Sequence, residues 1–226
     1  MSNKIDYGVE QIKTLEGIAA IRLRPGMYIG STGLDGLHHI TLEIISNAID
    51  EYLNGHCTNC DIEIDNNGYI TIQDNGRGVP FGKAKDGSET LVNIYTKLHT
   101  GAKFDSDGKN GYNTSGGMNG VGAKATNALS EKFIVISHRE NKKATGTFAK
   151  GKLISYIEET DDTVNKNGTI IKFLPDKEIF KDGITLNYSR LKAQIQELSY
   201  LSPGLTFTLK LPDDEEKIII VSNRGI

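Results

Sequence analysis

A polar series recurs along one segment of the chain at helical spacing. His39, Glu43 and Asn47 are four residues apart, and Asp50 and Glu51 continue the series. Residues at this spacing share one face of a helix. A carboxylate there can act as a general base, and an amide oxygen one turn later can bind magnesium. A solvated helix face is the alternative interpretation, but asparagine forms helices poorly and has no local reason to lie in mid-helix.

A second group of residues lies where a strand is predicted to end. From Asp74 to Pro80 the sequence reads Asp-Asn-Gly-Arg-Gly-Val-Pro. An aspartate at this position can accept a hydrogen bond from an exocyclic amine, and the glycines let the backbone approach a flat ligand. The same residues also suit an ordinary turn. The pattern therefore leaves both a ligand-binding strand end and a simple turn open.

Glycine is concentrated in a third segment, with seven glycines among the 22 residues from 101 to 122. The part from Thr114 to Gly122 precedes a predicted helix, so its backbone N–H groups can form a nest for phosphate oxygens. Ala123 stands where the Walker A motif requires lysine, and the order of the glycines differs from G-x-G-x-x-G. Phosphate binding and an ordinary surface loop are both compatible with this segment.

Hydrophobic periodicity predicts the elements that must position these groups. Helices are predicted at 14–22, 34–53, 89–99, 123–129 and 186–198, and strands at 61–65, 69–73, 133–137, 144–148, 154–158, 169–173, 206–211 and 217–221. The helices are collected before and between hairpin-like strands. This arrangement favours an α+β two-layer sandwich, in which helices cover one face of a mixed, mostly antiparallel sheet.

Composition excludes several classes of protein. The 226 residues are 37% hydrophobic and 24% charged, as in globular domains. No apolar run reaches the ~18 residues of a membrane helix, and the opening residues contain no apolar signal segment, so we expect a cytoplasmic protein without membrane contact. The net charge of −3 argues against an extended nucleic-acid-binding surface. Cys57 and Cys60 are expected to be reduced thiols, because no second pair of zinc ligands follows.

Taken in order, the three groups resemble the nucleotide-binding motifs of the GHKL ATPases. The resemblance narrows through RPGMYIG at 24–30, GLHH at 36–39, NAIDE at 47–51 and TSGG at 114–117. These strings look like the ATPase subunit of bacterial-type type IIA DNA topoisomerases, the group of gyrase B and topoisomerase IV ParE. The resemblance extends over nearly the whole chain and implies the GHKL, or Bergerat-type, ATPase fold.

The resemblance also implies a role for individual residues. Glu43 would be the general base and His39 would orient it, while Asn47 would hold magnesium. Asp74 would accept a hydrogen bond from the adenine amino group. The nucleotide-binding set that it implies is Asn47, Asp50, Glu51, Asp74, Arg77, Gly78, Pro80, Ile94, Lys103, Tyr112, Gly117, Asn119, Gly120, Val121, Gly122, Arg139 and Thr169, with Tyr7 reaching a second subunit.

The same resemblance implies a domain organisation and partners. Residues 1–14 would form an arm that dimerises two copies when ATP is bound, and residues 15–226 would form the ATPase domain, without the transducer and DNA-gate domains. Magnesium-dependent ATP hydrolysis would drive DNA strand passage together with an A-type subunit. Another GHKL nucleotide-gated dimerisation module is the alternative. The chain departs from the family pattern at Ser46, Ala102 and Met118-Asn119.

Overall fold

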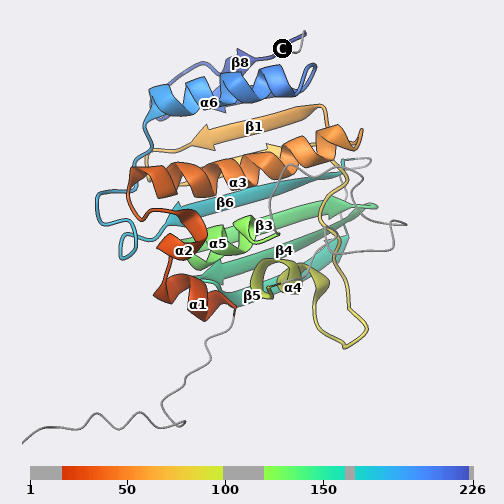
Figure 1. The fold of residues 1–226 in the computed structure, drawn as a ribbon. Coiled ribbons are helices and arrows are strands. Elements are labelled where there is room, and N and C mark those ends of the chain that lie inside the picture. The colour runs from red at the N-terminus through yellow and green to blue at the C-terminus, as the bar shows by residue number, and fades with distance from the viewer. Residues whose placement is uncertain (1–16, 99–119, 161–165, 224–226) are drawn as a thin grey trace, which may run out of the picture.

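The computed structural model describes residues 17–98, 120–160 and 166–223, and an eight-stranded sheet forms its centre (Figure 1). The strands are β1 (Asn59–Ile64), β2 (Ile70–Asp74), β3 (Ser130–Arg139), β4 (Lys142–Ala149), β5 (Lys152–Thr160), β6 (Gly168–Pro175), β7 (Thr206–Lys210) and β8 (Ile218–Ile220). Their order is β5-β4-β3-β6-β2-β1-β7-β8. Neighbouring strands are antiparallel except β1 and β7, which pair in parallel. The predicted mixed, mostly antiparallel sheet is confirmed.

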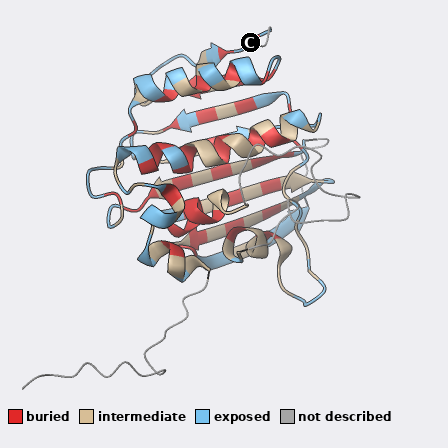
Figure 2. Cartoon of the chain, in the orientation of Figure 1, coloured by how far each residue is buried: buried red, intermediate tan, exposed pale blue. Residues whose placement is uncertain are grey.

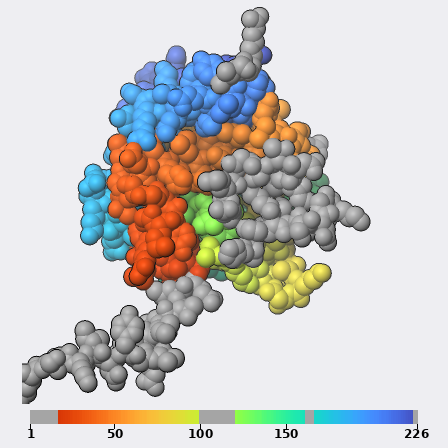
Figure 3. Space-filling view, viewed as in Figure 1, coloured from red at the N-terminus to blue at the C-terminus, as the bar shows by residue number. Residues whose placement is uncertain are grey.

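Helices cover one face of this sheet. They are α1 (Ile18–Leu23), α2 (Gly26–Ile29), α3 (Leu34–Leu53), α4 (Thr90–Thr96), α5 (Gly122–Ala128) and α6 (Tyr188–Leu201). In the space-filling view, the orange residues of the N-terminal helices and the blue residues of α6 form a continuous surface (Figure 3). The two-layer α+β arrangement is therefore as predicted. Within the three described ranges, no helix combines the length and apolar character that crossing a membrane requires.

The core lies between the two layers. Phe133 and Val135 of β3 are fully buried, whereas Ile134 between them is only partly buried, as the alternation of a sheet with one covered face requires. Phe133 pairs across the sheet with Phe173 of β6. Buried residues lie along the central strands and along parts of α3 (Figure 2). Burial of these apolar side chains is the main favourable contribution to folding.

The N-terminal helices differ from the prediction. Apolar spacing predicted a single helix over 14–22, ended by Pro25 and Gly26, but a one-turn helix, α2, follows α1 and begins at Gly26. Pro25 is tolerated immediately before it, because the first backbone N–H groups of a helix have no intrahelical acceptor. Gly30, with φ of +75°, ends α2. A single turn is too short to show a hydrophobic period, so the sequence did not reveal it.

Candidate functional site

The polar series lies on one face of α3, which packs over β1 and β2 of the sheet. Nε2 of His39 lies 3.8 Å from Oε1 of Glu43, and the Glu43 side chain is 24% exposed. Asn47, one turn further on, is also partly buried, whereas Asp50 is fully buried. The face therefore offers a half-buried carboxylate with an imidazole on one side and an amide on the other. A group in this setting can take a proton from a bound water.

Asp74 ends β2 beneath the C-terminal part of α3. Its Oδ1 accepts hydrogen bonds from the backbone N–H of Gly76 (2.8 Å) and of Thr169 (3.3 Å). Burial and, to a smaller extent, the nearby charge of Glu51 together raise the pKa of Asp74 to about 6, against the lowering effect of its hydrogen bonds with Gly76 and Thr169. Asp74 is thus a partly buried carboxyl whose second oxygen can accept from a ligand amine.

Glycine is required around Asp74 for steric reasons. Gly78 has φ of +76°, and a Cβ atom there would lie 2.3 Å from the carbonyl oxygen of His138. A Cβ atom on Gly168, which has φ of +150°, would lie 2.3 Å from the carbonyl oxygen of Asp74. Both residues let neighbouring segments approach closely at the strand ends. The chain bends directly after Asp74, and this geometry is compatible with both interpretations, a simple turn and a ligand-binding strand end.

Arg77 joins this turn to α3. Its Nε and Nη2 donate to the two carboxylate oxygens of Glu51 at 3.1 and 2.9 Å, and its backbone N–H also donates to Glu51. The Glu51 side chain is 12% exposed in this pair. A bidentate pair fixes the orientation of the guanidinium as well as its position. The last turn of α3 and the segment after β2 are thereby held together.

The segment from Gly78 to Pro80 is held from the other side by β3. Nη1 of Arg139 donates to the carbonyl oxygen of Gly78 at 3.2 Å, and the hydroxyl of Ser137 donates to the carbonyl oxygen of Val79 at 2.7 Å. The nucleotide-binding set implied by the family resemblance includes Arg139, whereas Ser137 was not predicted from the sequence. The available signal was a serine at a core-facing position of the alternating strand. Ile94 of α4 is partly buried and packs against the core.

The start of α5 lies against α3. Gly122 packs directly on the Glu43 carboxylate. The hydroxyl of Thr126 donates to the carbonyl oxygens of Ile40 (3.1 Å) and Gly122 (3.0 Å), which ties the two helices together. Nζ of Lys124, a buried residue, donates to the carbonyl oxygen of Gly120 at 2.6 Å. Neither Thr126 nor Lys124 was predicted from the sequence, although Lys124 stands one position after Ala123, the residue that breaks the Walker A pattern.

Some predicted site residues lie outside the described ranges. These are Tyr7, Lys103, Tyr112, Gly117 and Asn119. The described members come from α3, the end of β2 and the segment after it, α4, β3, the start of β6, and the start of α5 with the residues just before it. Glu43, in the middle of α3, contacts the start of α5, and Glu51, in its last turn, contacts the segment after β2, so the C-terminal half of α3 meets residues far apart in sequence.

The donor set around Asn47 restricts the kind of metal that it could hold. Among the described residues, no three histidine, cysteine or carboxylate side chains are close enough together to bind a metal ion. A structural metal ion that is coordinated entirely by protein side chains does not fit the donor residues around Asn47. Magnesium fits, because it commonly keeps its waters and binds through one or two protein oxygens together with substrate phosphates.

The fold and these contacts place the chain in a known class of proteins. Residues 32–178 match the model of the histidine kinase-, DNA gyrase B- and HSP90-like ATPases, and the chain belongs to this family. It is 45% identical over 204 residues to the DNA gyrase B protein of Synechocystis sp., covering 90% of this chain and 19% of that protein. It is 43% identical over 209 residues to the DNA topoisomerase 4 B protein of Staphylococcus aureus, covering 92% of this chain and 31% of that protein.

A solved structure supports the same assignment of fold. The 43K ATPase domain of Thermus thermophilus gyrase B, in complex with an aminocoumarin, superimposes with a TM-score of 0.80 and 32% sequence identity. The match covers 92% of this chain and 52% of that chain. The chain spans about a fifth of the length of the gyrase B relative and about a third of the length of the topoisomerase 4 relative. The expected GHKL fold is confirmed.

Proposed function

We propose that this chain is the ATP-binding and ATP-hydrolysing domain of a B-type subunit of a type II DNA topoisomerase. The observation that carries the proposal is the position of Glu43, a half-buried carboxylate that lies between His39 and the glycine that begins α5. A base placed there faces the point where a helix N-terminus attracts phosphate. The similarity to gyrase B and to the corresponding topoisomerase IV protein supports the same reaction.

In this proposal the Asp74 end of β2 binds the base of the nucleotide. Asp74 accepts a hydrogen bond from the adenine amino group, and Thr169 shares a bound water with it. Arg77, Gly78 and Pro80 form one wall of the adenine pocket. Arg139 lies at its outer rim. These assignments agree with the rigid frame of hydrogen bonds that surrounds the segment. Ile94, Asp50 and Glu51 complete the adenine side.

The other end of the site binds the phosphates of ATP. Asn47 is assigned to magnesium, which neutralises phosphate charge when bound. Backbone N–H groups of Gly120, Val121 and Gly122 bind the phosphates, together with those of Gly117 and Asn119. Lys103 and Tyr112 add further phosphate contacts. Gly117, Asn119, Lys103 and Tyr112 lie outside the described ranges. Glu43 takes the proton of the attacking water while His39 holds the carboxylate in position. Preorganised groups of this kind commonly supply the largest catalytic contribution.

The wider role of the protein belongs to the same proposal. Hydrolysis would be coupled to dimerisation through the N-terminal arm with Tyr7, and to DNA strand passage with an A-type subunit. The names of the relatives support the assignment to a B-type topoisomerase subunit. Supercoiling and decatenation assays on the longer B-type subunit with its partner would separate gyrase from topoisomerase IV. An ATPase rate per chain that does not change with protein concentration would contradict the dimer requirement.

The hydrolysis proposal is tested by the substitution Glu43→Ala. A general base acts in the transition state, so turnover should fall by about 10²–10⁴-fold while ATP affinity changes little. Phosphate release and isothermal titration calorimetry measure the two quantities separately. The matched control is Glu197→Ala on the exposed side of α6, which should change neither. Full turnover in the Glu43 variant would show that Glu43 is not the general base. A wild-type chain that binds ATP but does not hydrolyse it would favour the alternative, a nucleotide-gated dimerisation module.

A further inference from the structure

Arg22 of α1 binds the C-terminal end of α5. Its Nη1 donates to the carbonyl oxygen of Ala128, the last residue of α5, at 2.7 Å, and its Nη2 donates to Oδ2 of Asp176 at 2.7 Å. These partners are 106 and 154 residues away from Arg22 in sequence. The last carbonyl groups of a helix have no donor within the helix, and a cation beside them also complements the helix dipole. A single planar guanidinium therefore ties α1, α5 and the segment after β6 together.

Asp176 holds this guanidinium from a buried position. The Asp176 side chain is 3% exposed, whereas that of Arg22 is 21% exposed. The backbone N–H of Asp176 donates to the carbonyl oxygen of Leu129 at 2.9 Å, and its Oδ1 accepts from the backbone N–H of Glu178 at 3.0 Å. Asp176 therefore binds the residue after α5 directly and orients Arg22 on the last residue of the helix. Charge-assisted hydrogen bonds of this kind are stronger than neutral ones.

The position of α5 depends on such contacts because its side chains are small. Its seven residues read GAKATNA, and five of them are glycine, alanine or threonine. Small side chains make few of the van der Waals contacts that hold a helix in place. α1 lies beside α5 (Figure 1). Gly151 of the β4–β5 turn approaches both helices, since a Cβ atom there would lie 2.2 Å from Ile18 and 3.2 Å from Ala128. Besides the hydrogen bond from Thr126 to α3, contacts at its C-terminal end therefore fix α5.

The two ends of α5 must move together. A helix of seven residues is only about 10 Å long. Ala128 is at one end, and Gly122, at the other end, packs on the Glu43 carboxylate. A shift of the C-terminal end would therefore move Gly122 by a similar distance and displace Glu43.

We propose that Arg22 is a positioning residue for ATP hydrolysis, because it fixes α5 from its C-terminal end and so keeps Glu43 in place through Gly122. This role rests on the proposed function, in which Glu43 takes the proton of the attacking water. A base acts in the transition state, so loss of Arg22 should lower turnover more than ATP affinity. A merely stabilising residue would instead reduce the fraction of folded chains, and with it the number of ATP sites and the turnover in the same proportion.

The test is a double-mutant cycle between Arg22→Gln and Glu43→Ala in the 226-residue chain. Arg22→Gln alone should lower single-turnover phosphate release by roughly 10–100-fold, as expected for a misplaced catalytic group, while ATP affinity in calorimetry falls much less. In the Glu43→Ala background the same change should cause almost no further loss, because residues that act as a unit are not additive. Thermal unfolding shows whether each variant folds.

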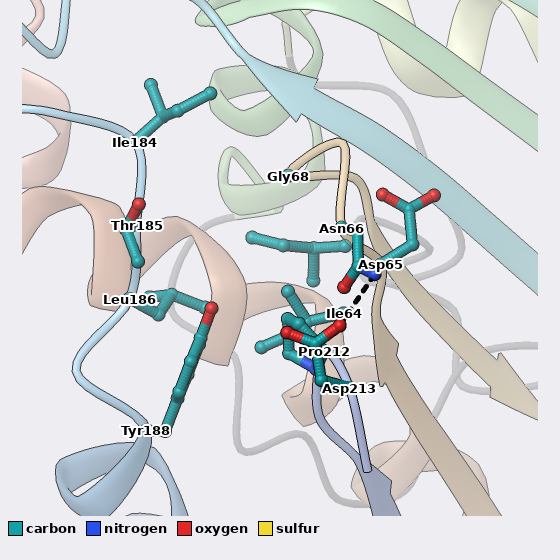
Figure 4. A pocket seen from close by; sticks show the side chains of 11 residues that line it. Ile64, Asp65, Asn66, Gly68, Ile184, Thr185, Leu186, Tyr188, Pro212 and Asp213 are labelled. Carbon is teal, nitrogen blue, oxygen red and sulfur yellow. Dashed lines mark hydrogen bonds between the residues drawn. The ribbon is translucent and has the colours of Figure 1, made fainter. Parts of the chain in front are cut away.

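Two control variants separate this role from a general loss of contacts. Lys150→Gln removes a second cation near Asp176, at 3.7 Å from its Oδ2, and leaves the side-chain contact with α5 intact. Asn66→Ala removes a hydrogen bond of 2.8 Å between other segments. It runs from the β1–β2 turn to Asp213 after β7, at the mouth of a cavity of about 420 Å³ (Figure 4). Both controls should keep normal turnover.

Asp176→Asn tests the same link should Arg22→Gln fail to fold. It keeps the shape of the residue and its backbone bond to Leu129 but makes the acceptor neutral, so it should show the same pattern with a smaller loss. Full additivity with Glu43→Ala, equal losses of affinity and turnover, or normal turnover in the folded variants would overturn the proposal. If Glu43→Ala itself keeps full turnover, the proposed function and the role of Arg22 fail together. If it loses turnover and the losses add, only the role of Arg22 fails.

Discussion

A Cβ atom on Gly122 would lie 1.8 Å from Oε2 of Glu43, so the first residue of α5 leaves no room for any side chain beside the proposed base. The glycine is needed here for close approach, since its φ is not in the left-handed region. Glu43 and the start of α5 therefore hold one another in position. The proposed base and the proposed phosphate-binding segment form a single steric unit.

The substitution Gly122→Ala should therefore displace Glu43. A misplacement of about 1 Å can cost 10²-fold in rate, and we expect a loss of turnover of at least about that size. Steady-state ATPase assays measure the effect, and thermal unfolding shows whether the domain still folds. The matched control is Gly26→Ala, where nothing lies within 4 Å of the added Cβ atom. Normal turnover in a folded Gly122 variant would show that Glu43 does not need this position.

Asp74 gives ATP binding a pH dependence. Its pKa of about 6 means that the carboxyl becomes protonated as the pH falls below 6, and a protonated carboxyl accepts less well from the adenine amine. The affinity for ATP should therefore fall by up to about tenfold per pH unit below 6. Asp74→Asn should lower affinity at pH 7 by about 1–3 kcal/mol and weaken the preference for adenine over guanine.

The comparison of the two chains isolates Asp74 from other titrating groups. Calorimetry between pH 5 and pH 8 should show a smaller pH dependence for the asparagine variant than for the wild type. Protonation also stabilises the ligand-free domain, because a folded-state pKa above the unfolded value makes the folded state more stable as the pH falls from about 6 towards 4. Parallel pH profiles for the two chains would show that Asp74 does not contact the base.

The two cysteines should hold no metal. Both are buried and unpaired by disulfide, and burial raises the pKa of Cys57 to about 11 and that of Cys60 well above its usual value. Zinc requires thiolates, which these surroundings disfavour. EDTA should leave the thermal midpoint unchanged, and both thiols should react with iodoacetamide much more slowly than in urea. One tightly bound zinc per chain in elemental analysis would contradict this expectation.

The sequence predicted those elements whose pattern is long enough to show a period. The apolar spacing from Leu34 to Leu53 predicted α3 with both ends correct, and the alternation on either side of Gly68 predicted the β1–β2 hairpin. It could not predict that β7 pairs in parallel with β1, because a strand pattern does not specify its neighbour. The one-turn helix α2 was missed for lack of any period.

Site residues that belong to a local motif could be predicted from the sequence. Site residues whose contacts join distant segments of the chain could not. The series on α3 and the turn after Asp74 are local, so their residues could be named from the sequence. Ser137 and Thr126 serve the site through hydrogen bonds to Val79 and Ile40, which are 58 and 86 residues away. No spacing rule relates such pairs, and only the folded chain brings them together.

His38, the neighbour of the proposed catalytic imidazole, should act as a structural residue that must stay neutral. It is buried, its Nε2 accepts from the backbone N–H of Asn187 at 3.2 Å, and its Nδ1 lies 2.9 Å from Oε1 of Gln194. Because Nε2 accepts, the proton of the neutral ring is on Nδ1 and is donated to Gln194. The ring thereby joins α3 to the start and the middle of α6.

Burial lowers the pKa of His38, against a raising effect of its bond to Gln194, while the charge of Arg190 lowers it and that of Asp35 raises it. A folded-state pKa below the unfolded value means that the unfolded chain binds the proton more readily, so His38 makes the fold less stable as the pH falls below about 6.5.

His38→Asn should cost about 1–3 kcal/mol at pH 7, because it breaks two buried hydrogen bonds. Urea unfolding at pH 7 and pH 5 should show this difference from the wild type becoming smaller at the lower pH. The comparison between chains removes the opposite contribution of Asp74, which both retain. A difference that stays constant between the two pH values would mean that His38 keeps its ordinary pKa and does not need to be neutral.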